Sequence, residues 1–129
     1  MERKITLMAI AFGVTAVIFG AFGAHALKKV LTPDALVSFE TGVRYQLYHA
    51  LFLLYIATTS LVDDARKKQI FSMTLFGVLF FSGSIYLLTT SALSGTDFTP
   101  IGLVTPLGGA LLISAWITLF IGVYKKKAE

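Results

Sequence analysis

This sequence contains no cysteine and few charged residues, which make up 14% of its 129 positions. Soluble domains usually carry about 25% charged residues, so the shortage argues against a water-soluble fold. The absence of cysteine excludes a disulfide framework, thiolate ligands and a thiol nucleophile. The motifs Cys-x-x-Cys-His, His-Glu-x-x-His and Gly-x-Ser-x-Gly, typical of attached haem, zinc peptidases and serine hydrolases, are also absent. The sequence therefore specifies no catalytic residue, no metal ligand and no cofactor.

Four long apolar runs fill most of the chain: Ile5–Leu27, Tyr45–Val62, Ile70–Ala92 and Ile101–Val123. A helix needs about 20 apolar residues to cross a bilayer, and it satisfies its own backbone groups there. The runs predict an all-α fold, a four-helix transmembrane bundle, with residues 1–129 forming a single integral membrane domain. The basic start and Ala24-His25-Ala26 also resemble a cleavable signal. However, the first run exceeds a signal's apolar region of about 7–15 residues, so we expect it to stay as a membrane helix.

Basic residues beside the ends of these runs indicate an orientation. With four spans, both ends of the chain and the 63–69 connection lie on one side of the membrane. That side carries Arg3, Lys4, Arg66, Lys67, Lys68, Lys125, Lys126 and Lys127, and the other carries Lys28, Lys29 and Arg44. The positive-inside rule predicts that both termini are cytoplasmic. The net charge of +4 then meets anionic membrane lipid rather than nucleic acid.

The connection between the first two runs contains a helix-like segment. Thr32-Pro33 is typical of a helix start, because proline at the first helical position lacks an N–H that would be unpaired there. Leu36, Phe39 and Val43 then recur at helical spacing among polar residues. The pattern predicts a short amphipathic interfacial helix, lying at the outer membrane surface between helices one and two.

Polar side chains concentrate where the first two spans meet the outer surface. The candidate ligand-binding residues are His25, Glu40, Arg44, Tyr45, Tyr48 and His49. His25 lies near the end of the first run and His49 a short way into the second, so we expect both imidazoles at a similar depth on adjacent antiparallel helices. Glu40 and Arg44 have the spacing of an i,i+4 salt bridge, and Gln46 adds a hydrogen-bonding group. Polar groups near lipid need partners, so we expect these residues to face protein or water.

Several functions fit this cluster. We favour a small binding or accessory membrane subunit, with a lipid headgroup as one ligand that the cluster can hold. The two histidines can also ligate haem or take part in a metal site with Glu40. The tyrosines with Arg44 can hold a quinone, and a haem or a quinone would make the protein a redox component. A small-solute transporter is another alternative, with Thr105-Pro106 as a hinge. Every Asp and Glu lies outside the apolar runs, which argues against proton coupling through a mid-membrane carboxylate. The structural alternative is an aromatic belt and a polar clasp that holds the amphipathic helix on the bundle.

Small residues recur at helical spacing in the first run, at Ala9, Gly13, Ala16, Gly20 and Gly23. Small side chains let helix backbones approach closely in lipid, where packing replaces the hydrophobic effect. They predict close packing within one bundle, and a homo-oligomer or a larger membrane complex is the alternative.

Two stretches carry a family resemblance: Phe22-Gly23-Ala24-His25-Ala26-Leu27, and the segment from Phe39 to Ala50 with Tyr45-Gln46-Leu47-Tyr48-His49. With them, the chain resembles the small bacterial inner-membrane proteins grouped as domain of unknown function 423, related to eukaryotic transmembrane protein 256. Gly83-Ser84-Ile85-Tyr86 and Thr105-Pro106-Leu107-Gly108-Gly109 match in character. The resemblance covers nearly the whole chain and implies a roughly four-helix protein of the bacterial plasma membrane. It implies no catalytic role for any residue.

Overall fold

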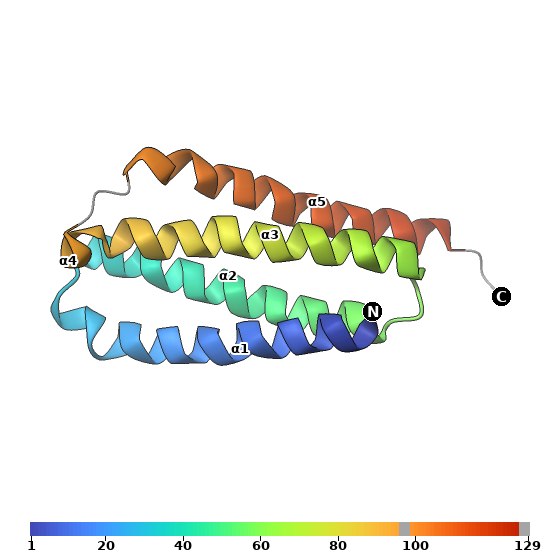
Figure 1. The fold of residues 1–129 in the computed structure, drawn as a ribbon, viewed down its shortest axis with the longest axis horizontal. Coiled ribbons are helices and arrows are strands. Elements are labelled where there is room, and N and C mark those ends of the chain that lie inside the picture. Colours follow the sequence, from blue (N-terminus) through green and yellow to red (C-terminus); the bar gives the residue numbers. More distant parts are fainter. Residues whose placement is uncertain (96–98, 127–129) are drawn as a thin grey trace.

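The computed structural model describes residues 1–95 and 99–126, apart from the side chains of residues 92, 94 and 99. Its elements are α1 (Glu2–Ala24), the 3-10 helix η1 (Leu27–Lys29), α2 (Pro33–Thr58), α3 (Asp64–Thr89), α4 (Ser91–Ser94), the 3-10 helix η2 (Thr99–Leu103) and α5 (Val104–Lys125). The described residues form no strand, and the four long helices lie side by side as a bundle (Figure 1). The predicted all-α, four-helix bundle is confirmed.

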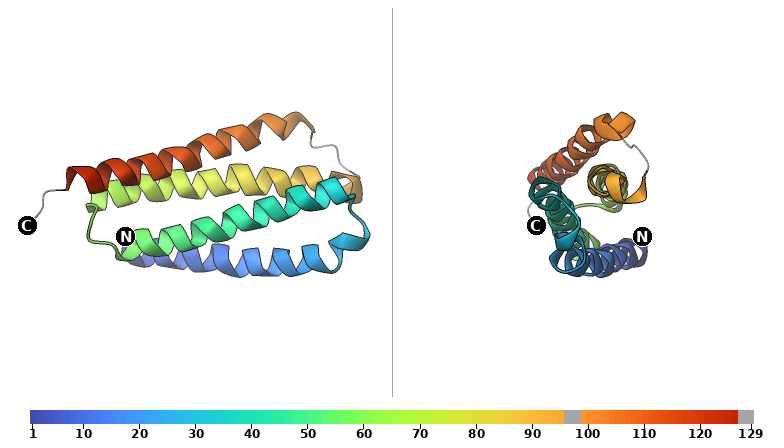
Figure 2. Two further views of the ribbon diagram at one scale, coloured as in Figure 1. Left: turned by 180° about the vertical axis from the view of Figure 1, so that it is seen from behind. Right: turned by 90° about the vertical axis from the view of Figure 1, so that its left-hand side faces the viewer.

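Each long helix runs antiparallel to the next along the chain (Figure 1). α2 packs between α1 and α3, and α3 packs between α2 and α5. The end-on view in Figure 2 shows α1 and α5 on opposite sides of the α2–α3 pair. The start of α1, the α2–α3 connection and the end of α5 lie at one end of the bundle, which we name the basic end after Arg3, Lys4 and Arg66. The opposite end, with η1 and α4, is named the distal end.

The start of α2 differs from the separate interfacial helix expected from the sequence. The amphipathic segment after Pro33 is not a separate interfacial helix, because it forms the first turns of α2, which continues without a break to Thr58. Thr32 caps this start as predicted, and its Oγ1 accepts a backbone N–H of the first turn at 3.2 Å. Phe39 is 4% exposed, and its ring lies 5.1 Å from that of Tyr86 in α3. The apolar face of the segment therefore packs on the bundle instead of turning aside to the membrane surface.

Pro106 lies in the first turn of α5, which begins at Val104 directly after η2. The first backbone N–H groups of a helix have no intrahelical partner, so a proline there removes no hydrogen bond from the helix interior. The position of Pro106 gives no support to the transporter hinge that the Thr105-Pro106 pair suggested.

In the part of the chain that the structure describes, three helical segments are long and apolar enough to cross a membrane: Glu2–Lys29, Asp64–Thr89 and Pro100–Lys125. α2 is not among them, although it has 26 residues. Arg44, Gln46 and His49 lower its mean hydropathy. The fourth span, expected over residues 45–62, therefore stays a prediction, and it depends on how α2 is enclosed by α1 and α3.

Glycine allows α3 and α5 to approach closely. A Cβ on Gly77 would lie 2.6 Å from a leucine side chain of α5, and a Cβ on Gly108 would overlap the backbone nitrogen of Phe81. In α1, Ala9 and Ala16 are each 1% exposed. These small residues serve packing within one bundle, as the sequence predicts. The alternative of a seam between copies of the chain stays a prediction.

Lys67, near the start of α3, is 3% exposed, although lysine is normally found at the surface. Its Nζ donates to Glu2 Oε1 at 3.3 Å and to the backbone oxygen of Ala57 at 3.5 Å. The Glu2 side chain is 66% exposed. Lys67 thus joins the first turn of α1 and the last turn of α2 to α3 at the basic end.

We expect Glu2→Gln to lower the free energy of unfolding by about 1–2 kcal/mol, because it leaves the buried Lys67 ammonium without its counter-ion. Lys67→Met removes that charge and places an apolar side chain in the same space, so it should lower the free energy of unfolding by less than Glu2→Gln does. Thermal unfolding in mild detergent measures both variants. Glu40→Gln, which breaks an exposed pair with Arg44, is the control and should change stability by less than about 0.5 kcal/mol. Equal losses for Glu2→Gln and Glu40→Gln would contradict this account of Lys67.

Candidate functional site

The six candidate residues predicted from the sequence do not form one cluster. His25 follows the last residue of α1 and is exposed. Two residues before it, a Cβ on Gly23 would lie 3.3 Å from the Phe39 ring, which sets the register of α1 against α2. His25 lies two residues beyond this contact toward the distal end, and His49 lies ten residues beyond Phe39 in the opposite direction along α2. The two imidazoles are therefore separated in depth by twelve residues, or about 18 Å at the helical rise of 1.5 Å per residue. The expectation of a similar depth is therefore wrong.

Four of the candidates lie together on the outward face of α2. Arg44 Nη2 is 3.8 Å from Glu40 Oε2, which confirms the i,i+4 pair, and both side chains are about half exposed. The Tyr45 ring is 5.7 Å from that of Tyr48 and 5.0 Å from that of Phe81 in α3. Both tyrosines are exposed. This face can meet lipid headgroups or chains.

His49 is buried behind this face, between α2 and α5. Its Nδ1 lies 2.7 Å from the Tyr45 backbone oxygen, and its Nε2 accepts the indole N–H of Trp116 at 3.0 Å. A backbone oxygen can only accept, so Nδ1 carries the proton and His49 is the neutral Nδ1–H tautomer. Both ring nitrogens are thus used inside the bundle. With His25 far away, this arrangement does not support haem ligation by the two histidines.

No group of three or more His, Cys, Asp or Glu side chains gathers as a metal site in the part of the chain that the structure describes. The outward face of α2 contributes one carboxylate, that of Glu40, and it is already paired with Arg44. The geometry therefore offers no set of ligands for a metal ion there.

The other side of α2 carries a polar group that joins three helices. Gln46 is 4% exposed, and its Nε2 donates to the backbone oxygen of Phe12 at 2.9 Å and to Thr15 Oγ1 at 2.5 Å, both in α1. Its Oε1 accepts the hydroxyl of Tyr86, in α3, at 2.7 Å. Only the nitrogen of the amide can bond a backbone oxygen, so Phe12 fixes which way the amide faces. We name Thr15, Gln46 and Tyr86 the Gln46 network.

Two members of this network are not recognisable from the sequence alone. Gln46 is the single glutamine inside an apolar run, and a polar group there must find partners. Thr15 and Tyr86 lie 31 and 40 residues away from it, in runs where threonine and tyrosine are unremarkable. The sequence therefore indicates a buried amide that requires hydrogen-bond partners, but it does not indicate which residues those partners are.

The Gln46 network borders a hollow of about 210 Å³ between α1 and α3, with α2 behind it. A second hollow of about 280 Å³ continues toward the distal end, where Phe39 and apolar side chains of α1 and α3 line it. Phe19 and Tyr86 border both hollows, and their rings meet edge to face at 5.0 Å. Among the described residues, no charged side chain lines either hollow. We name the two hollows together the α1–α3 groove.

Gly83, in α3, lines the deeper hollow of the groove. Apart from its chain neighbours and the adjacent backbone of its own helix, a Cβ at this position would have no atom within 4 Å. Gly83 thus differs from Gly77 and Gly108, which allow two helices to touch. Its missing side chain leaves space open in the groove instead of making a contact possible.

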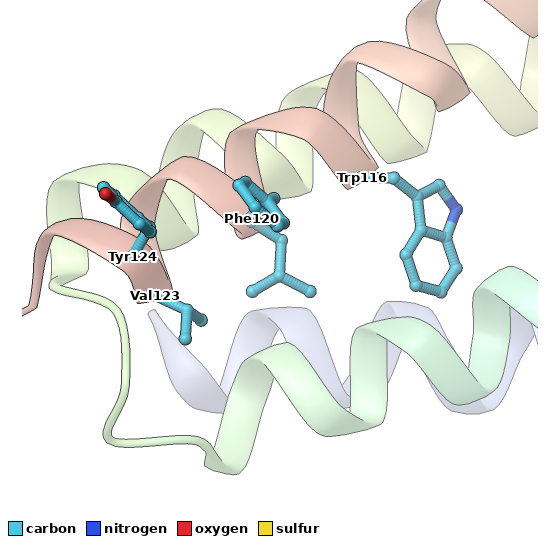
Figure 3. A pocket seen from close by; sticks show the side chains of 5 residues that line it. Trp116, Phe120, Val123 and Tyr124 are labelled. Carbon is cyan, nitrogen blue, oxygen red and sulfur yellow. The ribbon is translucent and has the colours of Figure 1, made fainter.

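A further hollow, of about 440 Å³, lies along α5 (Figure 3). It is lined by Trp116, Leu119, Phe120, Val123 and Tyr124. Figure 3 shows Trp116 pointing toward α2, where its N–H is already bonded to His49. All of the lining residues belong to one helix, and their largely apolar surface suits the acyl chains of surrounding lipid. The α1–α3 groove is the better candidate for a specific ligand, because three helices supply polar groups to it.

Comparison with known proteins identifies related chains. A family model described as protein of unknown function (DUF423) matches residues 19–109. A UPF0382 membrane protein of Haemophilus influenzae is 37% identical over 98% of both chains. A UPF0382 membrane protein of Staphylococcus saprophyticus is 40% identical over 82% of this chain and 84% of its own. The UPF0382 inner membrane protein YgdD of Escherichia coli is 32% identical over 99% of this chain and 95% of its own. No solved structure matches.

The matched residues include most of the α1–α3 groove, with Gln46, Gly83 and Tyr86. The relatives that match over nearly their whole length are membrane proteins, in agreement with the three apolar helical segments. The family resemblance noted in the sequence is confirmed. This chain is a membrane protein that belongs to the DUF423 family, whose biochemical function is unknown.

Proposed function

We propose that this protein is a binding or accessory subunit of the bacterial plasma membrane, and that it holds a small membrane-soluble molecule in the α1–α3 groove. The observation that carries this proposal is the position of the Gln46 network. Thr6, Thr41 and Thr58 each donate to the backbone oxygen four residues earlier in the chain, a local bond that needs no partner helix. The Gln46 network instead brings polar atoms of three helices to the border of one hollow.

The open space beside Gly83 supports the same proposal. Interiors are normally packed without voids, and a glycine inside a helix costs about 1 kcal/mol relative to alanine. No contact within the described bundle requires the missing side chain of Gly83. A ligand that fills the hollow would explain why position 83 is a glycine.

The proposal includes a topology with four crossings and both termini in the cytoplasm. Arg3, Lys4 and Arg66 lie at the basic end, the side that the positive-inside rule assigns to the cytoplasm. α2 can cross in spite of its lower hydropathy, because Gln46 and His49 find their partners within the bundle. In this orientation the groove extends toward the outer leaflet, and the outward face of α2 is left for lipid.

The chain contains no cysteine, so a single introduced cysteine reports on topology without background. We expect Ser38→Cys, at the exposed distal part of α2, to react with a membrane-impermeant maleimide added to intact spheroplasts. Lys126→Cys, just after α5, should react only after the membrane is opened. Reaction of Lys126→Cys in intact spheroplasts, with protection of Ser38→Cys, would reverse the topology.

Gly83→Leu is the direct test of the groove. Leucine favours a helix more than glycine does, so the variant should fold and remain as stable as the wild type. Its side chain occupies the deeper hollow, and we expect the amount of bound small molecule to fall about tenfold or more. Native mass spectrometry of the protein extracted in lipid nanodiscs measures this amount.

Gly13→Leu is the matched control. A Cβ on Gly13 also has no atom within 4 Å, but Gly13 does not line the groove. We expect this variant to keep the bound molecule. Wild-type protein that carries no bound molecule, or equal retention by Gly83→Leu and Gly13→Leu, would overturn the proposal. The same spectra report copy number, and hence whether a homo-oligomer forms.

A further inference from the structure

The polar side chains beside the deeper hollow donate all of their polar hydrogens inside the protein. Both N–H groups of Gln46 are donated to α1, and the hydroxyl of Tyr86 is donated to Gln46. The hydroxyl of Thr15 donates to the Ala11 backbone oxygen at 2.9 Å. The hydroxyl of Ser82, in α3, donates its one hydrogen to the Gly42 backbone oxygen at 2.7 Å. A ligand in the hollow therefore finds no free donor among these side chains.

Unused acceptor capacity remains in the same place. An amide oxygen can accept two hydrogen bonds, and Gln46 Oε1 accepts one, from Tyr86. The phenol oxygen of Tyr86 keeps lone pairs after it has donated its hydrogen. Both residues line the deeper hollow. The described side chains of the deeper hollow can therefore accept a hydrogen bond but have no polar hydrogen left to donate.

The rest of the groove limits the ligand further. None of the described side chains that line it is charged, so a phosphate or a carboxylate would be buried there without a described counter-charge. The outer hollow is formed mainly by Phe19, Phe22, Phe39 and Leu87, which suit a hydrocarbon tail. The edge-to-face pair of Phe19 and Tyr86 stands between the tail region and the acceptors, and the ligand must pass beside it.

We infer that the ligand of the α1–α3 groove is a neutral, membrane-soluble alcohol or phenol, whose hydroxyl donates to Gln46 Oε1 or to the Tyr86 oxygen and whose hydrocarbon tail lies in the outer hollow. This inference rests on the proposed function. An ether, ester or ketone of the same shape brings only acceptors, which would face the acceptors of the protein. Loss of a hydrogen bond in a site built for it discriminates strongly between such analogues.

The test uses three photoreactive probes with the same diazirine-bearing long-chain skeleton: an alcohol, its methyl ether and the corresponding ketone. Each is added to proteoliposomes of the wild type, and labelled residues are mapped by peptide mass spectrometry. We expect the alcohol to label residues of the groove about tenfold more than the ether or the ketone. Gly83→Leu should lose this labelling and Gly13→Leu should keep it.

Gln46→Leu removes one of the two acceptors, frees the Tyr86 hydroxyl and provides the second readout. In this variant the ether and the ketone should label the groove as strongly as the alcohol, because the freed Tyr86 hydroxyl can donate to the oxygen of each probe. If alcohol and ether label the wild type equally and Gly83→Leu abolishes both, the binding function stands and the hydroxyl inference is wrong. If Gly83→Leu leaves the labelling by all three probes unchanged, the proposed function fails and the inference fails with it.

Discussion

Gly108→Ala is expected to lower the free energy of unfolding by about 3 kcal/mol, the largest effect that we expect from a glycine-to-alanine change among the described residues. A Cβ at this position would lie 2.7 Å from the carbonyl carbon of Phe80 and 2.8 Å from the Cα of Phe81. These are backbone atoms of α3, which cannot move aside as a flexible side chain does. The methyl group therefore forces α5 away from α3 along the contact that holds α5 on the bundle.

The neighbouring Gly109→Ala is the matched control, and the expected change has the opposite sign. A Cβ on Gly109 would lie 3.7 Å from Cδ1 of Phe81, an ordinary van der Waals contact. Alanine should then stabilise the helix by up to about 1 kcal/mol through its higher helix propensity. Unfolding in a series of detergent and denaturant mixtures measures both variants. A stabilised Gly108→Ala would show that α3 and α5 are farther apart than described.

Gln46→Leu is expected to lower the free energy of unfolding by about 2 kcal/mol. The side chain keeps its size, but α1 loses two hydrogen bonds to α2, and the hydroxyl of Tyr86 loses its acceptor. Hydrogen bonds between membrane helices contribute about 1 kcal/mol each, and a buried polar group left unpaired costs about 1–3 kcal/mol. Gln69→Leu, at an exposed position of α3, is the control and should change stability by less than about 0.5 kcal/mol.

A double-mutant cycle with Tyr86→Phe separates the network from simple packing. Tyr86→Phe alone leaves Gln46 Oε1 without a donor and should cost about 1 kcal/mol. The double variant removes both partners, so its loss should be smaller than the sum of the two single losses by about 1 kcal/mol. Strictly additive losses would mean that the Tyr86 hydroxyl and the Gln46 amide do not interact, and the Gln46 network would have to be abandoned.

The helices were predictable because their causes are local. Long apolar runs predict membrane helices from composition alone, and Thr32-Pro33 marks the start of α2 through a cap that involves only its first turn. The i,i+4 spacing of Glu40 and Arg44 predicts their pairing within one helix. The continuous α2 was not predicted, because the segment after Pro33 is amphipathic by itself. Only the burial of Phe39 between α1 and α3 shows which surface its apolar face meets.

The candidate site depended on contacts between distant residues, and there the sequence was insufficient. The depth of His25 relative to His49 follows from the register of α1 against α2, which is set where Gly23 meets Phe39. The partner of His49 is Trp116, 67 residues away, and no local pattern connects them. Gln46 was visible as a polar group in an apolar run, but the groove beside it is formed by three helices and has no signature in any one of them.

The central claim is that the α1–α3 groove is occupied in the membrane, with the ligand's polar end at Gln46. The most direct measurement is an experimental structure of the wild-type protein, crystallised from a lipidic mesophase without exposure to harsh detergent. We predict elongated non-protein density between α1 and α3, passing beside Phe19 and ending within hydrogen-bonding distance of Gln46 Oε1 or the Tyr86 oxygen. A groove closed by its own side chains, or density no stronger there than along the hollow of α5, would contradict the claim.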